Sequence, residues 1–393
     1  MIKHILIFLV YVVLINKISM GQDSDTVRIW NGEQLPKTAD MQILQGVTFQ
    51  VIKSYEFDKD GYRFLHGVAL AWHKGNLYAS FGHNKGGENT DTEEARVRVS
   101  NDGGKSWGEI VTIDSGEEPG LGVSHGVFLS HQGKLWAFHG AYSGTMTKVH
   151  TRAYQLNEES KKWEYKGVII QGGFWPLQEP LKMSDGNWIM SGISVEKGNP
   201  AAVAISHGED FTKWDLVAIP KAPDLKMWGE SAVFLEGTRV VNIARYGAQP
   251  VALISFSEDC GRTWTESKPS NLSMATSKPY AGTLTTGQHY LICSSTADGG
   301  GRRSPLTITV TRVGETFFSK IYVIRHARFP EGPGESHERV ALSYPYAVEH
   351  DKKLYVGYSN SGGGIGRKGQ GRELWNNNSA ELAIIPISLL AGQ

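Results

Sequence analysis

The chain has 393 residues, and its 40 basic and 40 acidic side chains leave no formal net charge at pH 7. Neither sign forms a long block, which argues against nucleic acid or a membrane surface as a partner bound through charge. Cys260 and Cys293 are the only cysteines, so a dense disulfide framework is excluded, while one bridge between them stays open.

The first segment, residues 1–22, has a basic start, an apolar run and a small-residue exit. This order is typical of a secretory signal peptide rather than a membrane anchor, because no other apolar stretch is long enough to cross a bilayer. No cysteine follows the run directly, which argues against a lipoprotein anchor. We therefore expect a soluble mature chain, residues 23–393, that is exported to the periplasm or secreted.

From residue 66 onward, a strand–turn–strand pattern returns about every 55 residues, as it does in radial repeat architectures. Each copy is followed by a third strand of alternating or apolar residues, such as EEARVRVS or AAVAISH. Period-two patterning bounded by Gly, Asp and Asn turns indicates antiparallel strands. The copies open with a polar or aromatic residue at equivalent positions, namely His66, His125, Gln178, Glu230, Tyr280 and Tyr344.

Two of the third strands run into the turn S-x-D-x-G-x-x-W, at Ser100–Trp107 and at Ser257–Trp264. In such a turn the Asp side chain accepts backbone N–H groups, the Gly permits positive φ and the Trp packs into the sheet. The motif resembles the Asp-box of sialidase-like β-propellers, where it lies away from the active face. It therefore indicates the fold and does not indicate a sialidase.

The repeat predicts an all-β, single-domain β-propeller over residues 23–393. The residues outside the six copies amount to more than one further repeat and less than two. We expect a closing blade built from the N-terminal strands TVRIW, MQIL and FQVIKSYEF together with the C-terminus. This reasoning favours seven blades, with six as the alternative.

A propeller brings the starts of its innermost strands together around a central pocket, and the loop after each second strand returns to the same face. The openers, together with Glu179, should therefore face one concave surface. Residues near the ends of the second strands should join them: His83, His139, Tyr142, Arg245, Tyr246 and Asn360. The predicted binding set is completed by Lys278, Arg302 and Arg303.

Structural explanations compete with these functional ones. A histidine beside a glycine, as in the first two openers, is often only a hydrogen-bonded structural residue, and Arg245–Tyr246 could cap a blade edge. The same histidine at the same repeat position in two blades favours function. His73 and His131 fall in turns on the opposite face, where we expect surface residues.

Histidine, tyrosine and arginine together suit proton abstraction near neutral pH. A uronic acid is an apt substrate, because removal of its C5 proton creates an enolate-like carboxylate that Arg or protonated His stabilises. Loss of the C4 group then leaves a 4,5-unsaturated sugar, by chain cleavage in a lyase or by loss of water in a dehydratase. Glu179 and Glu230 also leave open a glycosidase with two carboxylates. No cofactor or metal is expected, although clustered histidines could hold zinc incidentally.

The block from Phe64 to Trp107 is similar to the family of secreted bacterial propellers that includes ulvan lyases and α-L-rhamnosidases. The resemblance implies seven blades and a glycan containing rhamnose and uronic acid. Lyases of this group use His and Tyr as base and acid, with Arg neutralising the carboxylate. The related rhamnosidases use one His on the other face, where His73 and His131 are the candidates. True sialidases need an arginine triad with an early F/Y-R-I-P-like motif, which Tyr62–Leu65 matches poorly.

The sequence thus predicts a monomeric carbon–oxygen lyase that acts by β-elimination on ulvan-type uronate and rhamnose saccharides, as a lyase or as a dehydratase. His66 and His125 are the expected acid–base pair, Tyr246 the proton partner and Arg245 the group that neutralises the carboxylate. The other polar residues of the ring are expected to bind substrate. An α-L-rhamnosidase and a non-catalytic glycan-binding propeller are the alternatives.

Overall fold

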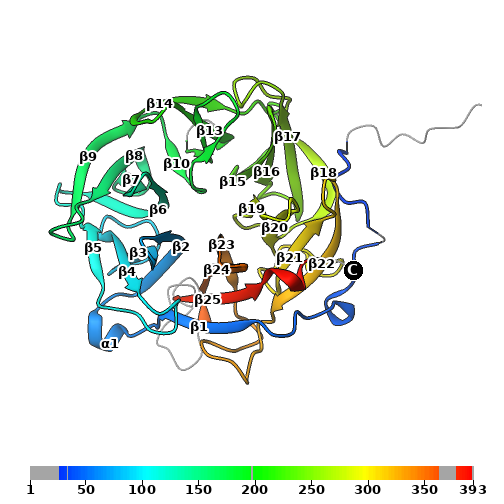
Figure 1. Ribbon diagram of the computed structural model, residues 1–393, viewed down its shortest axis with the longest axis horizontal. Coiled ribbons are helices and arrows are strands. Elements are labelled where there is room, and N and C mark those ends of the chain that lie inside the picture. The colour runs from blue at the N-terminus through cyan, green and yellow to red at the C-terminus, as the bar shows by residue number, and fades with distance from the viewer. Residues whose placement is uncertain (1–25, 33, 196–197, 363–377, 392–393) are drawn as a thin grey trace, which may run out of the picture.

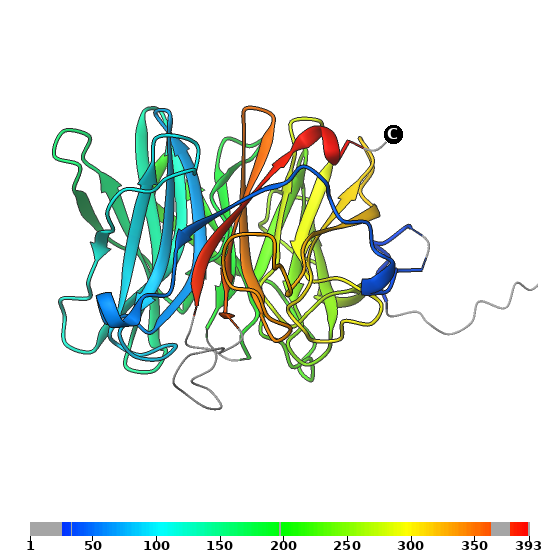
Figure 2. The same ribbon diagram turned by 90° about the horizontal axis from the view of Figure 1, so that it is seen from below.

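The computed structural model describes residues 26–32, 34–195, 198–362 and 378–391, and the predicted signal peptide lies outside them. The described strands form six antiparallel sheets. Figure 1 shows these sheets as blades set around a central axis. In the side view of Figure 2 the blades stand side by side and span the thickness of the ring from one face to the other.

The blades follow one another along the chain. Blade one contains β2 (Phe64–His73), β3 (Asn76–Asn84), β4 (Glu93–Ser100) and β5 (Val111–Asp114). Blade two contains β6 (Leu121–His131), β7 (Lys134–Ser143), β8 (Thr147–Leu156) and β9 (Trp163–Ile170). Blade three contains β10 (Phe174–Pro176), β11 (Leu181–Lys182), β12 (Trp188–Ser194), β13 (Ala201–His207) and β14 (Asp210–Ala218).

The second half of the ring repeats this order. Blade four contains β15 (Ser231–Glu236), β16 (Arg239–Arg245), β17 (Val251–Ser257) and β18 (Lys268–Ser273). Blade five contains β19 (Tyr280–Thr283), β20 (His289–Cys293), β21 (Leu306–Thr311) and β22 (Phe318–Arg325). Blade six contains β23 (Leu342–His350), β24 (Lys353–Asn360), β25 (Ser379–Pro386) and, from the N-terminal side, β1 (Thr48–Lys53). One turn of helix, α1 (Phe57–Asp60), links β1 to blade one.

Strand β1 closes the ring. It pairs antiparallel with β25, with Thr48 opposite Ile384, and so becomes the outer strand of the blade that Tyr344 opens. The described residues before β1 form no named strand and pair with blades four and five through isolated bridges, for example Val27 with Ser270. The prediction of seven blades was therefore wrong and the six-bladed alternative is correct. The last repeat carries three strands of its own and takes its fourth from the N-terminal segment, so the described strands are all used in six blades.

The core consists of apolar side chains packed between neighbouring blades. Phe81, Phe128 and Phe138, from the first two strands of blades one and two, are fully buried there. The predicted third strands EEARVRVS and AAVAISH coincide with β4 and β13. Period-two alternation therefore located the strands well, because each blade buries apolar side chains against the next.

The two Asp-box turns form as predicted. In the second, Ser257 Oγ accepts the N–H of Gly261 at 2.8 Å, and Asp259 accepts the N–H of Thr263 at 2.8 Å. The indole of Trp264 packs against the core of blades three and four. The turns follow the C-terminal ends of β4 and β17. These ends lie on one face of the ring and the starts of the innermost strands lie on the other, so the turns occupy the face away from the openers.

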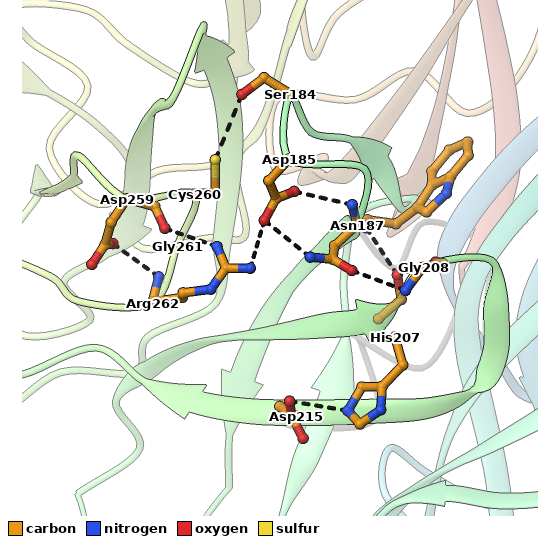
Figure 3. Close-up of polar contacts among 12 residues, drawn as sticks. Ser184, Asp185, Asn187, His207, Gly208, Asp215, Asp259, Cys260, Gly261 and Arg262 are labelled. Atoms are coloured by element: carbon orange, nitrogen blue, oxygen red, sulfur yellow. Dashed lines mark hydrogen bonds and ion pairs between the residues drawn. The ribbon is translucent and has the colours of Figure 1, made fainter.

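The second Asp-box turn also links two blades. Figure 3 shows Arg262 reaching from this turn to Asp185 in the turn of blade three, where the two side chains lie 2.5 Å apart. Cys260, in the same turn, lies near Ser184. Cys260 and Cys293 are both free and buried, so the disulfide that the sequence left open is not formed.

Candidate functional site

A cavity of about 240 Å³ lies where the starts of the inner strands meet. Its size suits one small ring rather than a long chain, since pockets for drug-sized ligands hold roughly 300–1,000 Å³. Blades one, two, four, five and six give it its polar side chains: His66, Glu88, Asn89, Glu93, Ser124, His125, Glu230, Arg245, Arg303 and Tyr344. Its apolar wall comes mainly from blades two to four: Phe64, Met146, Trp175, Leu177, Ile193, Val195 and Trp228.

Irregular strand pairing aims three of the openers at this cavity. The register shifts between His66 and Ala69 in β2, between Val123 and Gly126 in β6, and between Ser343 and Tyr346 in β23. A bulge leaves extra residues unpaired and redirects their side chains, and such bulges are common beside active sites. The repeated His-Gly dipeptide follows from this geometry.

The left-handed backbone of these bulges explains one glycine and marks one tyrosine. Gly67 has φ +69°, and a Cβ there would lie 2.1 Å from the His125 ring. Glycine is therefore required so that His125 can lie against blade one. Tyr344 has φ +54°, which a residue with a large side chain rarely adopts. Such conformations persist where the surroundings hold them and cluster at functional sites.

Tyr344, Glu230 and Arg245 form a connected group on the cavity wall. The Tyr344 hydroxyl donates to Glu230 Oε1, and Arg245 Nη1 lies 2.5 Å from Glu230 Oε2. Burial, reinforced by the Glu230 carboxylate, raises the pKa of Tyr344 well above its usual value. The phenol therefore carries its proton at rest, with a carboxylate in place to accept that proton.

The cavity holds two neutral histidines in a cationic environment. The ring centroids of His66 and Tyr344 lie 3.7 Å apart, and those of His66 and His125 lie 6.0 Å apart. Burial lowers the pKa of His66 well below its usual range, and the neighbouring basic groups lower it further: His125, Arg303, Lys278 and Arg245. Burial likewise lowers the pKa of His125 to about 3. Neither ring nitrogen of His66 has a partner among the described residues.

Glu93 is a cavity residue that the sequence analysis missed. It accepts a hydrogen bond from Ser124 Oγ at 2.5 Å and one from the Tyr142 hydroxyl at 2.6 Å. Burial raises the pKa of Glu93 to about 7. A signal existed, because Glu93 opens the third strand of blade one, at the same face as the openers. The sequence pattern of this strand indicated only the fold, and its first residue was not predicted to be part of the site.

Two predicted residues lie away from the cavity although the residue beside each of them lines it. Tyr246 follows Arg245 directly and packs, half-buried, against the apolar cluster of blades three and four. Strand β16 ends at Arg245, which lines the cavity, and the chain beyond this strand places Tyr246 in the apolar cluster. Tyr246, the predicted proton partner, does not line this cavity. Arg302 is exposed and bonds to backbone oxygens of its own loop, while the adjacent Arg303 lines the cavity.

Other predicted residues are buried and are not on the cavity wall. The His83 ring stacks on Tyr62 with centroids 4.0 Å apart, and the His139 Nδ1 is bonded to the Ser124 carbonyl at 2.8 Å. Burial lowers the pKa of His83 to about 2 and that of His139 to about 4. Tyr142, fully buried, contacts Glu93 as described above.

A third group joins blades to one another. Gln178 bonds through its amide to the backbone of Val233 and Ala281, so it connects blade three to blades four and five. It lies in the gap between β10 and β11, where the inner strand of blade three is interrupted. Asn360 bonds Glu381 at 2.7 Å within blade six. These two contacts are structural.

A fourth group forms a second polar cluster. The Tyr280 hydroxyl contacts both carboxylate oxygens of Glu179 at 2.7 and 2.6 Å. Lys278 donates to the carbonyl of Pro345 at 2.8 Å, and burial lowers its pKa to about 7. None of these side chains lines the cavity, although the Lys278 charge acts on both cavity histidines.

His73 and His131 lie at the far ends of β2 and β6, as predicted. His73 is buried, contrary to expectation, and its ring bonds Ser130 and Glu158 at 2.8 and 2.7 Å. Within the described ranges, no group of three His, Cys, Asp or Glu side chains is placed to hold a metal ion. No described helix is long and apolar enough to cross a membrane.

Fold and site together define a six-bladed β-propeller with an ionisable cavity on its axis. Residues 75–356 match the model of the BNR repeat-like domain, and the chain belongs to this family. The ulvan-lyase relationship that the sequence suggested is therefore supported only at the level of a sialidase-like propeller family. No curated protein matches the sequence.

Solved structures share the fold at low sequence identity. A Dyadobacter fermentans protein of unknown function has a TM-score of 0.64 at 15% identity, over 87% of this chain and 100% of that one. The K499G mutant of NanB sialidase from Streptococcus pneumoniae has a TM-score of 0.63 at 11% identity, over 87% and 71%. The Hadza microbial sialidase Hz136 has a TM-score of 0.63 at 13% identity, over 86% and 68%.

Proposed function

We propose that this protein is a carbohydrate-active enzyme that acts on a terminal acidic sugar, with Tyr344 as the reacting group. The observation that carries the proposal is the contact between the Tyr344 hydroxyl and Glu230 on the wall of a small cavity. A tyrosine becomes a nucleophile when a neighbouring base takes its proton. Glu230, held in place by Arg245, is that base.

The charge around the cavity supports an anionic substrate. Arg245 and Arg303 line it, and the charge of Lys278 acts on its histidines. Guanidinium groups bind carboxylates and sulfates through paired hydrogen bonds. Trp175 and Trp228 add apolar faces on which a sugar ring can lie. The cavity volume favours one terminal sugar over an internal segment of a chain.

Glycoside hydrolysis is the reaction that this geometry favours. Glu230 takes the phenolic proton, the Tyr344 oxygen bonds to the anomeric carbon, and the glycosidic bond breaks as its oxygen takes a proton. Glu88, an exposed carboxyl among the cavity residues, supplies that proton. Water then attacks the anomeric carbon: its hydroxyl stays on the sugar, its proton goes to Glu88, and Glu230 returns its proton to the phenol as the tyrosyl–sugar bond breaks. Tyrosine nucleophiles of this kind occur in sialidases, and two of the similar structures are sialidases.

A sialic acid itself has less support as the substrate. Arg63, in the early position where a sialidase arginine is expected, is exposed and lies over the Phe57 ring at 5.2 Å. Strand β2, which begins just after Arg63, instead contributes His66 to the cavity wall. Two arginines and a neutral histidine suit a smaller acidic sugar, such as a uronic acid.

β-Elimination on a uronate of the ulvan type is the second candidate, and His66 is the observation that favours it. Its neutral ring lies against Tyr344, with both nitrogens free of partners among the described residues. In this reaction His66 takes the C5 proton, the electron pair forms the C4–C5 double bond, and the C4 oxygen leaves with the Tyr344 proton. The leaving group is a sugar in a lyase and water in a dehydratase.

Incubation with a panel of oligosaccharides ending in acidic sugars, ulvan fragments included, tests the proposal. Hydrolysis gives a free reducing sugar without new ultraviolet absorbance, whereas elimination gives the absorbance of a conjugated 4,5-alkene. Mass spectrometry separates chain cleavage from loss of water, and free rhamnose identifies a rhamnosidase.

Tyr344→Phe keeps the ring and removes the hydroxyl, so we expect a loss of at least about 10³-fold in kcat. The matched control is Tyr355→Phe, in the same blade, because Tyr355 packs against Trp72 away from the cavity. Unchanged turnover in Tyr344→Phe contradicts both reactions. Binding without turnover by the unmodified protein indicates a glycan-binding propeller.

A further inference from the structure

A chain of hydrogen bonds runs from a buried carboxylate to a histidine of the cavity. Ser124 Oγ lies 2.5 Å from Glu93 Oε1 and 3.1 Å from His125 Nδ1. Glu93, Ser124 and His125 all line the cavity. The opposite nitrogen of the ring, Nε2, has no partner among the described residues. The proposed reactions assign no role to this chain.

Proton counting decides which nitrogen of His125 carries hydrogen. A serine hydroxyl has a single proton to donate, and the short contact to Glu93 directs that proton to the carboxylate. Ser124 Oγ can therefore only accept from His125, so Nδ1 must carry the ring proton. Burial keeps the ring neutral at pH 7 by lowering its pKa to about 3, so Nε2 holds a bare lone pair.

The same assignment survives protonation of Glu93. Tyr142 lies 2.6 Å from Glu93 Oε2 and 2.9 Å from the Thr90 carbonyl. A proton on Oε2 can be donated to the Tyr142 oxygen, while Tyr142 turns its own proton to Thr90. Ser124 still donates to Oε1, so the ring of His125 is unaffected. The other groups that act on Glu93 are Glu88, by its charge, and Asn84, by a hydrogen bond.

The backbone around this chain is built to hold it. Gly82 on β3 faces the pair, and a Cβ there would lie 2.2 Å from Glu93 Oε1 and 3.0 Å from Ser124 Oγ. His139 bonds the Ser124 carbonyl at 2.8 Å, and the Trp175 indole bonds the His125 carbonyl at 3.1 Å. Side chains fixed in this way keep one geometry when substrate enters.

We propose that Glu93 and Ser124 hold His125 in the Nδ1–H tautomer, so that its Nε2 accepts a hydrogen bond from a hydroxyl group of the bound sugar. Glu93 and Ser124 are positioning residues, and His125 is the residue that contacts the substrate. The carboxylate of the sugar then lies at the arginines, since a bare ring nitrogen repels an anion. This inference rests on the proposed function only in taking a sugar as the ligand.

Nitrogen NMR of the protein with ¹⁵N-labelled histidine reads the tautomer directly, without any substrate. We expect His125, assigned by comparison with His125→Gln, to be Nδ1–H between pH 6 and 8. Ser124→Ala and Glu93→Met should both raise the population of the Nε2–H tautomer. The first removes the acceptor of the Nδ1 proton, and the second frees the serine hydroxyl to donate its proton to Nδ1. Ser124→Thr retains the hydroxyl and should keep the Nδ1–H form. Tyr142→Phe removes only the hydrogen bond between Tyr142 and Glu93, so His125 should keep the Nδ1–H form in this variant too.

The Nε2–H form in the unmodified protein, or no change in the folded Ser124→Ala variant, overturns the tautomer assignment. The hydroxyl contact is tested with an acidic sugar from the oligosaccharide panel to which the unmodified protein binds. Ser124→Ala should weaken its binding about tenfold, and Ser124→Thr should restore it. If Ser124→Ala and Ser124→Thr bind the sugar equally well, the proposed contact with a sugar hydroxyl is overturned, while the tautomer assignment is unaffected. Absence of turnover on every glycan refutes the proposed function and leaves the NMR result standing.

Discussion

Replacing Arg245 with methionine tests the buried ion pair beside Tyr344. Arg245 Nη1 lies 2.5 Å from Glu230 Oε2, and the side chains are 17% and 5% exposed. An exposed pair would contribute ~0–1 kcal/mol, whereas removing one partner of a buried pair costs about 3–5 kcal/mol, because the other charge is left uncompensated. Glu230 is almost inaccessible and Arg245 keeps some contact with solvent. We therefore expect a loss of about 3 kcal/mol in the free energy of unfolding, at the lower end of that range.

Urea denaturation at pH 7, followed by tryptophan fluorescence, measures this loss. The double variant Arg245→Met/Glu230→Gln removes both charges and should recover about 2 kcal/mol of it. Arg302→Met is the matched control, because this exposed arginine bonds only to backbone oxygens of its loop and should change stability by under about 0.5 kcal/mol. A loss below about 1 kcal/mol for Arg245→Met, or a double variant no more stable than the single one, refutes the reasoning.

Three further predictions concern stability. Gly67→Ala should cost about 2–4 kcal/mol, because φ is +69° and the new Cβ would lie 2.1 Å from the His125 ring; Gly75→Ala, also at positive φ but facing open space, should cost about 1–2 kcal/mol, and equal losses would contradict the predicted clash. The buried neutral histidines, with pKa values of about 3 for His125 and about 4 for His139, stabilise the fold above pH 6.5, and this contribution is lost as the pH falls through those values. The urea concentration at the midpoint of unfolding should therefore fall as the pH is lowered from 6 to 4, and it should fall less steeply in His139→Gln. A midpoint that does not change with pH would contradict this prediction. Burial lowers the pKa of Lys278 to about 7, so the free energy of unfolding should rise from pH 7 to 10. The Lys278→Met variant should be more stable than the unmodified protein, and within this range the difference should be largest at pH 7. A difference in stability that does not change with pH would disprove this prediction.

The fold was readable from the sequence because each blade repeats the same physical requirement. Alternating residues bury one blade against the next, and Asp-box turns such as Ser257–Trp264 satisfy their own backbone groups locally. The blade number was not readable in the same way. It depends on Thr48–Lys53 pairing with a strand at the other end of the chain, and no local pattern records that partner. Residue arithmetic counted this strand as the start of another blade.

The candidate site was predictable as a face and only in part as a set of side chains. The repeat located His66, His125, Glu230 and Tyr344 on one cavity. It did not locate the bulges that re-aim them, because a bulge is a property of two paired strands. It also assigned Arg245 and Tyr246 to the same pocket, although β16 ends at Arg245 and the next residue packs against the apolar cluster of blades three and four.

The closure of the ring by β1 and β25 has a consequence for the order of assembly. Each of the other sheets is built from one continuous stretch of the chain, whereas the sixth pairs β1 with β25, which are separated by most of the chain. Pairing over such a separation is slow, because the entropy of a long loop is lost before any contact forms. Until the last strand has been synthesised, β24 presents a bare edge open to other chains, and Tyr344 stands in an unfinished blade. The molecule gains its cavity last.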